Sequence, residues 1–298
     1  MTAVEALKLG KRYGELWGLR GATFSIDRGE LTALLGPNGA GKTTTVKILA
    51  TILRPSTGEV RVPGYDVVKE HREVRERIAY LPQGCNVDGN WTPKEAVRWF
   101  LVSRGEKPSE AMAKTKYWLE ELGLWYVKDE TCWKLSGGMQ RKVLVAMVLA
   151  TEAEVVFLDE PTVGLDVESK YTVWKYLRSM SSRGRTILLT THGMKEAEIV
   201  ADKVIMLSKG SIVTQGRPKD LISKLRYNYK VIIGRSTDQI YNYPSLDLGG
   251  RRIVYVDDEG EVEDVIRGLS IKSYVRIERV GLEDVYLWLV RDEKGRAP

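Results

Sequence analysis

The sequence predicts an α/β protein with a parallel sheet covered by helices on both faces, followed by a smaller α+β domain. Three observations support this class: an apolar strand that enters a glycine-rich loop and a helix, two later apolar strands separated by a helix, and a change to short alternating elements near residue 225. We expect residues 1–225 to form the main domain, with a mainly helical subdomain at about 85–150. Residues 226–298 are expected to form a small accessory domain.

Length and composition are those of a folded, water-soluble chain. The protein has 298 residues, of which 43% are hydrophobic and 29% charged. Its apolar runs fall well short of the roughly 20 residues that a membrane-spanning helix needs, and the start has no apolar signal segment. We therefore expect a chain that neither spans nor crosses a membrane by itself.

Charge and cysteine content argue against a nucleic-acid partner, a disulfide framework and a cysteine-based metal site. The net charge is +6, but no run of five or more basic residues occurs, so no nucleic-acid partner is expected. The two cysteines, Cys85 and Cys132, are too few for a disulfide framework and form no metal-binding cluster with histidine. Both are expected to be reduced thiols, unless the source is a hyperthermophile, in which a disulfide between them could form.

The first elements can be placed from periodicity and capping residues. The apolar run 31–35 predicts a buried strand, and 42–53 has helical spacing. The segments 94–103 and 109–122 predict two helices of the helical subdomain, with Ser109 as the N-cap of the second.

The second half of the main domain continues the parallel sheet. Apolar runs at 155–158 and 186–191 predict strands buried on both faces, with a helix at 167–183 between them. Strands at 204–207 and 211–214 predict a closing hairpin.

The accessory domain begins after a short helix that runs from Pro218 to about Leu225. Beyond it we expect strands at 231–233, 252–256 and 274–277 and helices at 261–269 and 282–290.

A phosphate-binding motif connects the first buried strand to its helix. The segment Gly36 to Thr43 reads Gly-Pro-Asn-Gly-Ala-Gly-Lys-Thr and fits the pattern GxxxxGK[ST]. The glycines let backbone N–H groups converge on phosphate oxygens at the positive end of the helix. Lys42 would supply a full charge to the β and γ phosphates, and the Thr43 hydroxyl can bind Mg²⁺. The segment predicts a P-loop NTPase core, against the alternative of a plain glycine-rich turn.

Two acidic residues, Asp159 and Glu160, end the strand at 155–158. One acid there could simply cap the next helix. Two adjacent acids at the carboxyl end of a buried parallel strand instead indicate a catalytic edge, because open α/β sheets bind ligands there. Asp159 would hold Mg²⁺, directly or through water, and Glu160 would polarise the attacking water.

A second phosphate-seeking element lies at Leu135 to Arg141. Ser136 and the two following glycines predict a helix N-terminus with free N–H groups, which attracts anions. One chain thus has two sites suited to binding phosphate, the glycine-rich loop and the helix N-terminus at Ser136, but evidence for only one nucleotide.

These segments together resemble the ATP-binding cassette (ABC) ATPases over about residues 4–220. Gly36 to Thr44 is similar to their Walker A loop, 135–141 to their LSGGQ signature, 155–160 to their Walker B strand, and 164–166 to their D-loop.

Three further residues match single positions of the family. Gln83 stands where the Q-loop glutamine stands, His192 at the switch histidine, and Tyr13 at the aromatic residue that stacks on adenine.

The resemblance implies a full set of site residues for ATP and Mg²⁺. The implied catalytic residues are Glu160, His192 and Gln83. The implied Mg²⁺ ligands are Thr43, Gln83 and Asp159. The implied nucleotide-binding residues are Tyr13, Gly36, Pro37, Asn38, Gly39, Ala40, Gly41, Lys42, Thr43, Thr44, Ser136, Gly137, Gly138, Gln140 and Asp166.

The resemblance also explains the two phosphate-seeking sites. In this family two cassettes pack head to tail, so the signature of one copy would meet the γ-phosphate held by the Walker A loop of the other. A homodimer is expected. ATP hydrolysis would drive transport by separate integral membrane permease subunits, which places the chain at the cytoplasmic face of the cell membrane.

The end of the chain narrows the expectation to export. Leu282 to Leu287 resembles the LEDVFL-type ending of stand-alone subunits in drug, antibiotic or polysaccharide exporters.

Five of the eight tryptophans lie between residues 85 and 135, in the region that receives the membrane subunits in this family. They either dock there or belong to the core. These tryptophans are Trp91, Trp99, Trp118, Trp125 and Trp133.

Two alternatives lack their expected signals. A soluble ABC ATPase in DNA repair or translation would predict two cassettes in one chain, a long heptad insertion or iron–sulfur cysteines. A P-loop GTPase would predict an NKxD motif after a strand. The sequence contains none of these.

Overall fold

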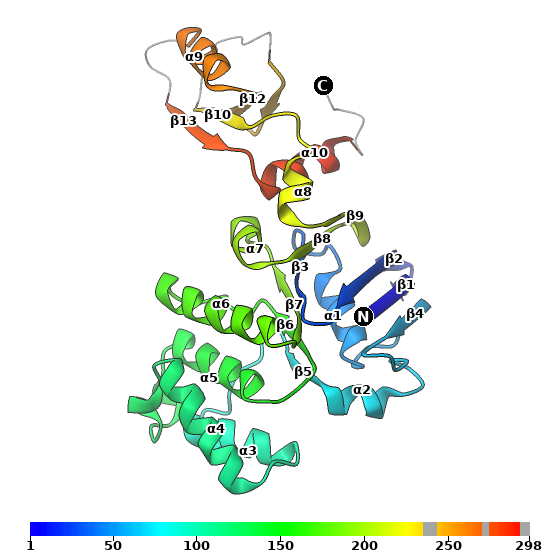
Figure 1. Cartoon of the computed structure of the whole chain (residues 1–298), viewed down its shortest axis with the longest axis vertical. Coiled ribbons are helices and arrows are strands. Elements are labelled where there is room, and N and C mark those ends of the chain that lie inside the picture. Colours follow the sequence, from blue (N-terminus) through cyan, green and yellow to red (C-terminus); the bar gives the residue numbers. More distant parts are fainter. Residues whose placement is uncertain (235–242, 270–273, 293–298) are drawn as a thin grey trace. The chain divides into compact units, whose positions relative to one another are not determined.

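The computed structural model describes residues 1–234, 243–269 and 274–292. The chain folds into two compact units (Figure 1). The first holds residues 1–193 and 200–214, and the second holds residues 194–199 and 215–298. The last six residues of the expected accessory domain lie outside the described residues. Within the described part, no helix has both the length and the apolar character that a bilayer crossing requires.

A six-stranded sheet with strand order β5-β6-β7-β3-β8-β9 forms the centre of the first unit. Its strands are β3 (Leu31–Leu35), β5 (Ile78–Leu81), β6 (Val155–Asp159), β7 (Thr186–Thr191), β8 (Lys203–Ser208) and β9 (Ser211–Gly216). The pairs that join β5, β6, β7, β3 and β8 are parallel, which confirms the predicted parallel sheet. Because β3, β6 and β7 are neighbours, the polar residues that follow each of them meet at one edge of the sheet.

The hairpin that closes this sheet also agrees with the prediction. β8 and β9 are joined by Lys209 and Gly210, which both have positive φ, +46° and +83°. Two central residues of this kind form the tight turn that suits the twist of a hairpin.

The helix after the glycine-rich loop is shorter than predicted. α1 spans Lys42–Leu49, whereas the spacing suggested 42–53. Thr51 has a φ of +62°, and the amides of Ile52 and Leu53 both donate to the carbonyl of Lys47. A residue in the left-handed conformation cannot continue a right-handed helix, so α1 ends before Thr51 and the next amides bond back to its last turn.

A second sheet, which is antiparallel and was not predicted, packs on the other side of α1. It contains β1 (Thr2–Tyr13), β2 (Leu16–Asp27) and β4 (Thr57–Arg61) in the order β2-β1-β4. Buried side chains from this sheet, from α1 and from the parallel sheet form one hydrophobic core. The core fixes the end of β1 relative to the glycine-rich loop.

The helical subdomain is present as predicted (Figure 1). It contains α3 (Pro93–Ser103), α4 (Pro108–Glu121), α5 (Gly137–Leu149) and two short 3₁₀ turns, η1 (Trp125–Val127) and η2 (Cys132–Lys134). Thr92 and Glu95 form a reciprocal capping box at the start of α3. Ser109 is not the N-cap of α4, because Pro108 already occupies the first turn, where a missing N–H costs nothing.

Three more helices complete the elements around the parallel sheet. α2 (His71–Arg77) leads into β5, α6 (Val167–Ser182) connects β6 to β7, and α7 (Met194–Val200) follows β7.

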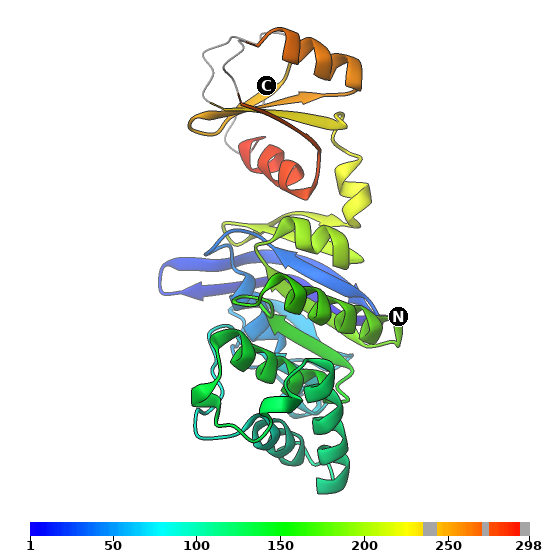
Figure 2. The same ribbon diagram turned by 90° about the vertical axis from the view of Figure 1, so that its left-hand side faces the viewer.

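The second unit contains a four-stranded antiparallel sheet with the order β11-β12-β10-β13. Its elements are α8 (Pro218–Ile222), β10 (Tyr229–Gly234), β11 (Ser245–Asp247), β12 (Arg251–Val256), α9 (Glu259–Arg267), β13 (Val275–Arg279) and α10 (Leu282–Asp292). Figure 2 shows α9 on one face of the sheet and α10 on the other, and a separate apolar cluster lies under each helix. The predicted α+β pattern is confirmed, with α8 ending three residues before Leu225.

Candidate functional site

Close backbone approaches explain the glycines of the loop between β3 and α1. A Cβ on Gly36 would lie 2.4 Å from the carbonyl oxygen of Leu207, and one on Gly41 would lie 2.6 Å from that of Gly18. Gly41 also caps α1 with a φ of +105°. The loop therefore brings the N-terminus of α1 against neighbouring backbone in a conformation that a larger residue would disturb.

Lys42 folds back over this loop. Its Nζ donates to the carbonyl oxygens of Gly36 at 2.7 Å and Pro37 at 3.0 Å. Burial lowers the pKa of the Lys42 ammonium, and the carboxylates of Glu160 and Asp159 partly oppose that shift. Among the described residues, the hydrogen-bond acceptors of the buried ammonium are neutral carbonyls, so it favours an incoming anion.

A cavity of about 280 Å³ opens beside Lys42. It is lined by Gly18, Asn38, Gly39, Gly41, Lys42, Thr43, Thr44, Gln83 and Glu160. The structure thus brings most of the glycine-rich loop together with Gln83 and Glu160, which come from segments far apart in the sequence.

The Asp159 carboxylate is fully buried at the end of β6. Its Oδ1 accepts a hydrogen bond from the hydroxyl of Thr190, but its buried Oδ2 has no hydrogen-bond partner in the part of the chain that the structure describes. A buried carboxylate oxygen without a partner is costly unless a cation or a donor satisfies it. Asp159 therefore fits the predicted role of a metal-binding group.

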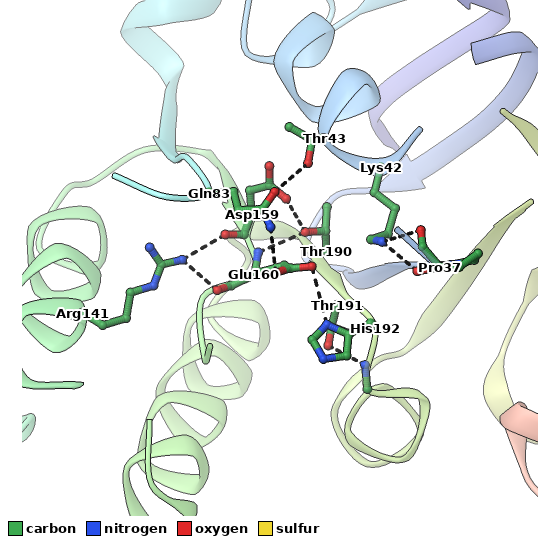
Figure 3. Close-up of polar contacts among 12 residues, drawn as sticks. Pro37, Lys42, Thr43, Gln83, Arg141, Asp159, Glu160, Thr190, Thr191 and His192 are labelled. Atoms are coloured by element: carbon green, nitrogen blue, oxygen red, sulfur yellow. Dashed lines mark hydrogen bonds and ion pairs between the residues drawn. The ribbon is translucent and has the colours of Figure 1, made fainter. Parts of the chain in front are cut away.

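A chain of polar contacts links the glycine-rich loop to both acids (Figure 3). The Thr43 hydroxyl donates to Gln83 Oε1 at 3.3 Å, and Gln83 Nε2 donates to Glu160 Oε2 at 2.9 Å. Nδ1 of His192 lies 3.6 Å from Glu160 Oε1. The structure thus brings together the three residues expected to be catalytic.

Glu160 has an unusual backbone conformation, with a φ of +51°. Its amide donates to the Thr190 hydroxyl at 3.0 Å. This left-handed turn directs the chain sharply out of β6, so that Asp159 stays in the sheet while the Glu160 side chain reaches the cavity.

Two residues that support the acids were missing from the predicted set. Arg141 on α5 donates from its guanidinium to the carbonyl oxygens of Asp159 at 2.9 Å and Glu160 at 2.7 Å. Thr190 contacts both acids from β7. Each has a local signal, since Arg141 is the last residue of the signature segment and Thr190 lies near the end of an apolar strand, but their partners depend on tertiary packing.

The signature residues lie at the start of α5, as predicted. The Ser136 hydroxyl accepts from the Met139 amide at 3.2 Å and so caps the helix. The Gln140 side chain donates to the carbonyls of Cys132 and Leu135, which fixes the preceding turn. No residue of 135–141 lines the cavity at Lys42.

Tyr13 lies beside the glycine-rich loop, and Asp166 lies at the start of α6. The Tyr13 hydroxyl is 3.4 Å from the Thr44 hydroxyl, and its ring is half exposed. Asp166 caps α6 by accepting from the Ser169 amide at 2.8 Å, and this hydrogen bond lowers its pKa.

Three of the five clustered tryptophans are exposed on the helical subdomain, namely Trp91, Trp99 and Trp133. Trp118 and Trp125 are partly buried. Cys85 and Cys132 are both free thiols, as expected.

Known proteins are similar to this chain over most of its length. A family profile described as "ABC transporter" matches residues 19–163. Nod factor export ATP-binding protein I from Burkholderia lata is 34% identical over 98% of both chains. Daunorubicin resistance ATP-binding protein DrrA3 from Streptomyces coeruleorubidus is 34% identical over 98% of this chain and 97% of its own length.

Solved structures agree on the fold. A structure described as the ATP-binding subunit of an ABC transporter has a TM-score of 0.69 and 28% identity, and covers 74% of this chain and 92% of its own. A dimeric ATP-binding cassette in a post-hydrolysis state with ADP and Pi has a TM-score of 0.66 and 24% identity, and covers 72% and 98%. With relatives that match over nearly its full length, the chain belongs to the ABC transporter family as one of its ATP-binding subunits.

Proposed function

We propose that this chain is the motor subunit of an exporter, in which two copies hydrolyse ATP to drive separate membrane subunits. The single observation that carries the proposal is the contact chain from Thr43 through Gln83 to Glu160, which connects the phosphate loop to a carboxylate at the cavity. The names of the relatives, which refer to Nod factor export and daunorubicin resistance, favour export.

In the proposed reaction Glu160 polarises a water molecule that attacks the γ-phosphate. Its carboxylate lies next to the cavity, with one oxygen held by Gln83 and the other facing His192. His192 would orient the water and the γ-phosphate, and Lys42 would neutralise developing charge on the phosphate oxygens. Asn38, Gly39, Ala40 and the other loop residues would hold the phosphates through backbone N–H groups.

The oxygen donors at this edge fit Mg²⁺. Thr43, Gln83 and Asp159 would hold it, and the partnerless Oδ2 of Asp159 supports that assignment. Mg²⁺ commonly uses one or two protein carboxylates together with substrate phosphates, and the described residues contain no all-protein cluster of three His, Cys, Asp or Glu ligands. When bound, the ion would neutralise charge on the β and γ phosphates.

The position of the signature supports a dimer. Because residues 135–141 do not line the cavity at Lys42, one copy does not complete its own phosphate site. We propose that Ser136, Gly137, Gly138 and Gln140 of a second copy cover the γ-phosphate, with Asp166 and Tyr13 at the border of the nucleotide. Gly137 suits this role, because a Cβ built on it meets no atom within 4 Å.

We propose that the membrane subunits dock on the helical subdomain, at the cytoplasmic face of the membrane. The exposed side chains of Trp91, Trp99 and Trp133 support this surface, since aromatic residues are enriched in protein interfaces. We also propose residues 1–225 as the ATPase domain and 226–298 as an accessory domain, although α8 and residues 194–199 cluster with the second of the two compact units.

Glu160→Gln tests the proposal. The amide keeps the size of the side chain but cannot polarise water, so turnover should fall by about a thousandfold while ATP binding persists. Incubated with ATP and Mg²⁺, the variant should elute as a dimer on size exclusion, and with ADP as a monomer. Lys42→Ala is the control and should stay monomeric with either nucleotide. A Glu160→Gln variant that hydrolyses ATP at the normal rate, or that remains monomeric with ATP, would contradict the proposal.

A further inference from the structure

A second cavity lies apart from the phosphate site, between α4 of the helical subdomain and α6. Its volume is about 430 Å³, which is within the range of pockets that bind small molecules. The residues that line it all belong to the first compact unit, and they differ from the described residues around the cavity at Lys42. The cavity is therefore a separate candidate for a binding site.

Aromatic rings form part of the cavity wall. Trp118 on α4 and Tyr176 on α6 meet edge to face, with ring centroids 5.2 Å apart and an angle of 77° between the ring planes. Tyr117 meets Trp118 in the same way, at 5.3 Å and 82°, and is half exposed. Trp118 and Tyr176 are only partly buried. Because these contacts hold the rings in place and leave part of their surface open, the wall suits a planar aromatic ligand.

Cations outnumber carboxylates around the cavity. The charged side chains that line it are Lys114, Lys175, Arg183 and Arg185 as cations, and Glu121 and Glu152 as acids. Four cations against two acids leave an excess of two positive charges. Lys114 does not supply the excess, because its Nζ lies 2.9 Å from Glu106 Oε1 and 2.8 Å from Glu152 Oε1.

Lys175, Arg183 and Arg185 supply the excess charge. In the part of the chain that the structure describes, none of the three forms a salt bridge with a carboxylate. Lys175 and Ser179 are four residues apart on α6, and Arg183 follows four residues later as the C-cap. This spacing places both cations on one side of the helix.

Arg185 reaches the cavity from the residues that lead into β7. Its guanidinium donates to the carbonyl oxygens of Thr151 at 2.6 Å and Leu149 at 3.5 Å, which completes the end of α5 but leaves its charge without an ion-pair partner. Burial lowers the pKa of this guanidinium, Glu152 partly opposes the shift, and the positive charge of Arg183 adds to it. An anion bound beside the two arginines would offset both the desolvation and the mutual repulsion.

We propose that this cavity binds a small aromatic anion, namely a carboxylate, sulfonate or phosphate ester on a planar ring. The ring would lie against Trp118 and Tyr176. The anionic group would lie beside Lys175, Arg183 and Arg185. Guanidinium groups bind such oxyanions through paired hydrogen bonds, and the aromatic wall selects the ring. This binding does not require ATP hydrolysis, so the proposal is independent of the function proposed above.

Naphthalene-1-sulfonate is the probe, and its binding to the full chain is measured by isothermal titration calorimetry at low salt. We expect one molecule per chain with a Kd of roughly 1 mM or tighter. Cyclohexanesulfonate lacks the aromatic face and naphthalene-1-methanol lacks the charge, so each should bind at least about tenfold more weakly. Saturating ADP with Mg²⁺ should leave the affinity for the probe unchanged, because the cavity at Lys42 lies elsewhere.

Substitutions test the cationic side of the cavity. Lys175→Gln and Arg183→Gln each remove one exposed charge and should weaken probe binding by about threefold to tenfold, and the double variant should bind more weakly still. Lys116→Gln is the matched control, because Lys116 is an exposed cation on α4 that does not line the cavity. Tyr176→Leu should also weaken binding, and urea denaturation checks that this variant is folded.

Hydrogen exchange locates the probe. Amides of α4 and of residues 175–185 should exchange more slowly when the probe is bound. Absence of binding, displacement by ADP, equal binding of cyclohexanesulfonate, protection confined to other segments, or the same affinity in the double variant and Lys116→Gln would each overturn the proposal. A chain that binds the probe as expected but does not hydrolyse ATP would contradict only the proposed function.

Discussion

The hydroxyl of Thr190 donates a hydrogen bond to Oδ1 of Asp159 at a point in the sheet where both side chains are fully buried. The same hydroxyl oxygen accepts from the Glu160 amide. One threonine therefore orients the proposed metal-binding carboxylate and the backbone of the proposed base, and connects β7, which ends before His192, to β6.

Thr190→Val should destabilise the protein, because it has nearly the same shape but removes both hydrogen bonds in a buried place. We expect a loss of about 1–3 kcal/mol in the free energy of unfolding, measured by urea denaturation without nucleotide. Thr190→Ser retains the hydroxyl and is the matched control. Equal stability of the valine variant and the wild type would mean that these hydrogen bonds contribute nothing.

Arg141→Lys should lower kcat, because a lysine cannot reproduce the planar fork that contacts two successive carbonyls after β6. A small displacement of Glu160 is sufficient for a loss of about tenfold to a hundredfold. KM for ATP should change little, since Arg141 does not line the phosphate cavity. Steady-state kinetics would check this, with exposed Arg183→Lys as the control, and full activity of Arg141→Lys would refute the positioning role.

Lys42 gives the stability of the nucleotide-free protein a defined dependence on pH. Burial lowers its pKa in the folded state from the ordinary value of 10.5, so between these two values the unfolded chain binds more protons than the folded one. The contribution of Lys42 to the free energy of unfolding must therefore rise with pH between its lowered pKa in the folded state and its ordinary pKa. Urea unfolding of the wild type and of Lys42→Met from pH 7 to about pH 10 should show the wild type gaining relative to the variant. A difference that stays flat or falls would show that the ammonium is not desolvated.

The parts of the site that could be predicted from the sequence are local. The phosphate loop, the two acids at the end of β6 and the turn before α5 each lie within a few residues, so spacing and residue type were sufficient. Arg141 and Thr190 were missed because their function depends on carbonyls and a carboxylate about twenty to thirty positions away in the chain. A pattern of residues does not reveal such partners without the packing.

The secondary-structure elements divide in the same way, into those that a local sequence pattern predicts and those that it does not. The strands β3, β6, β7 and β8 are short apolar runs and were placed correctly, whereas β5 was not predicted. The strands β1 and β2 alternate irregularly and were missed. Their register contains several shifts, which obscure the period of two that identifies a strand. In the C-terminal unit, Lys230 lies in a strand that the apolar pattern identified, but its burial against Asp284 could not be foreseen from a lysine in a strand.

The left-handed backbone of Glu160 places activity and stability in opposition at one position. A glycine there would adopt the same φ without the steric cost that a side chain brings, so the fold would gain from losing the carboxylate. Directed selection for thermal stability alone would favour glycine at position 160, which lacks the carboxylate needed for turnover. Only selection for ATP hydrolysis would keep the glutamate.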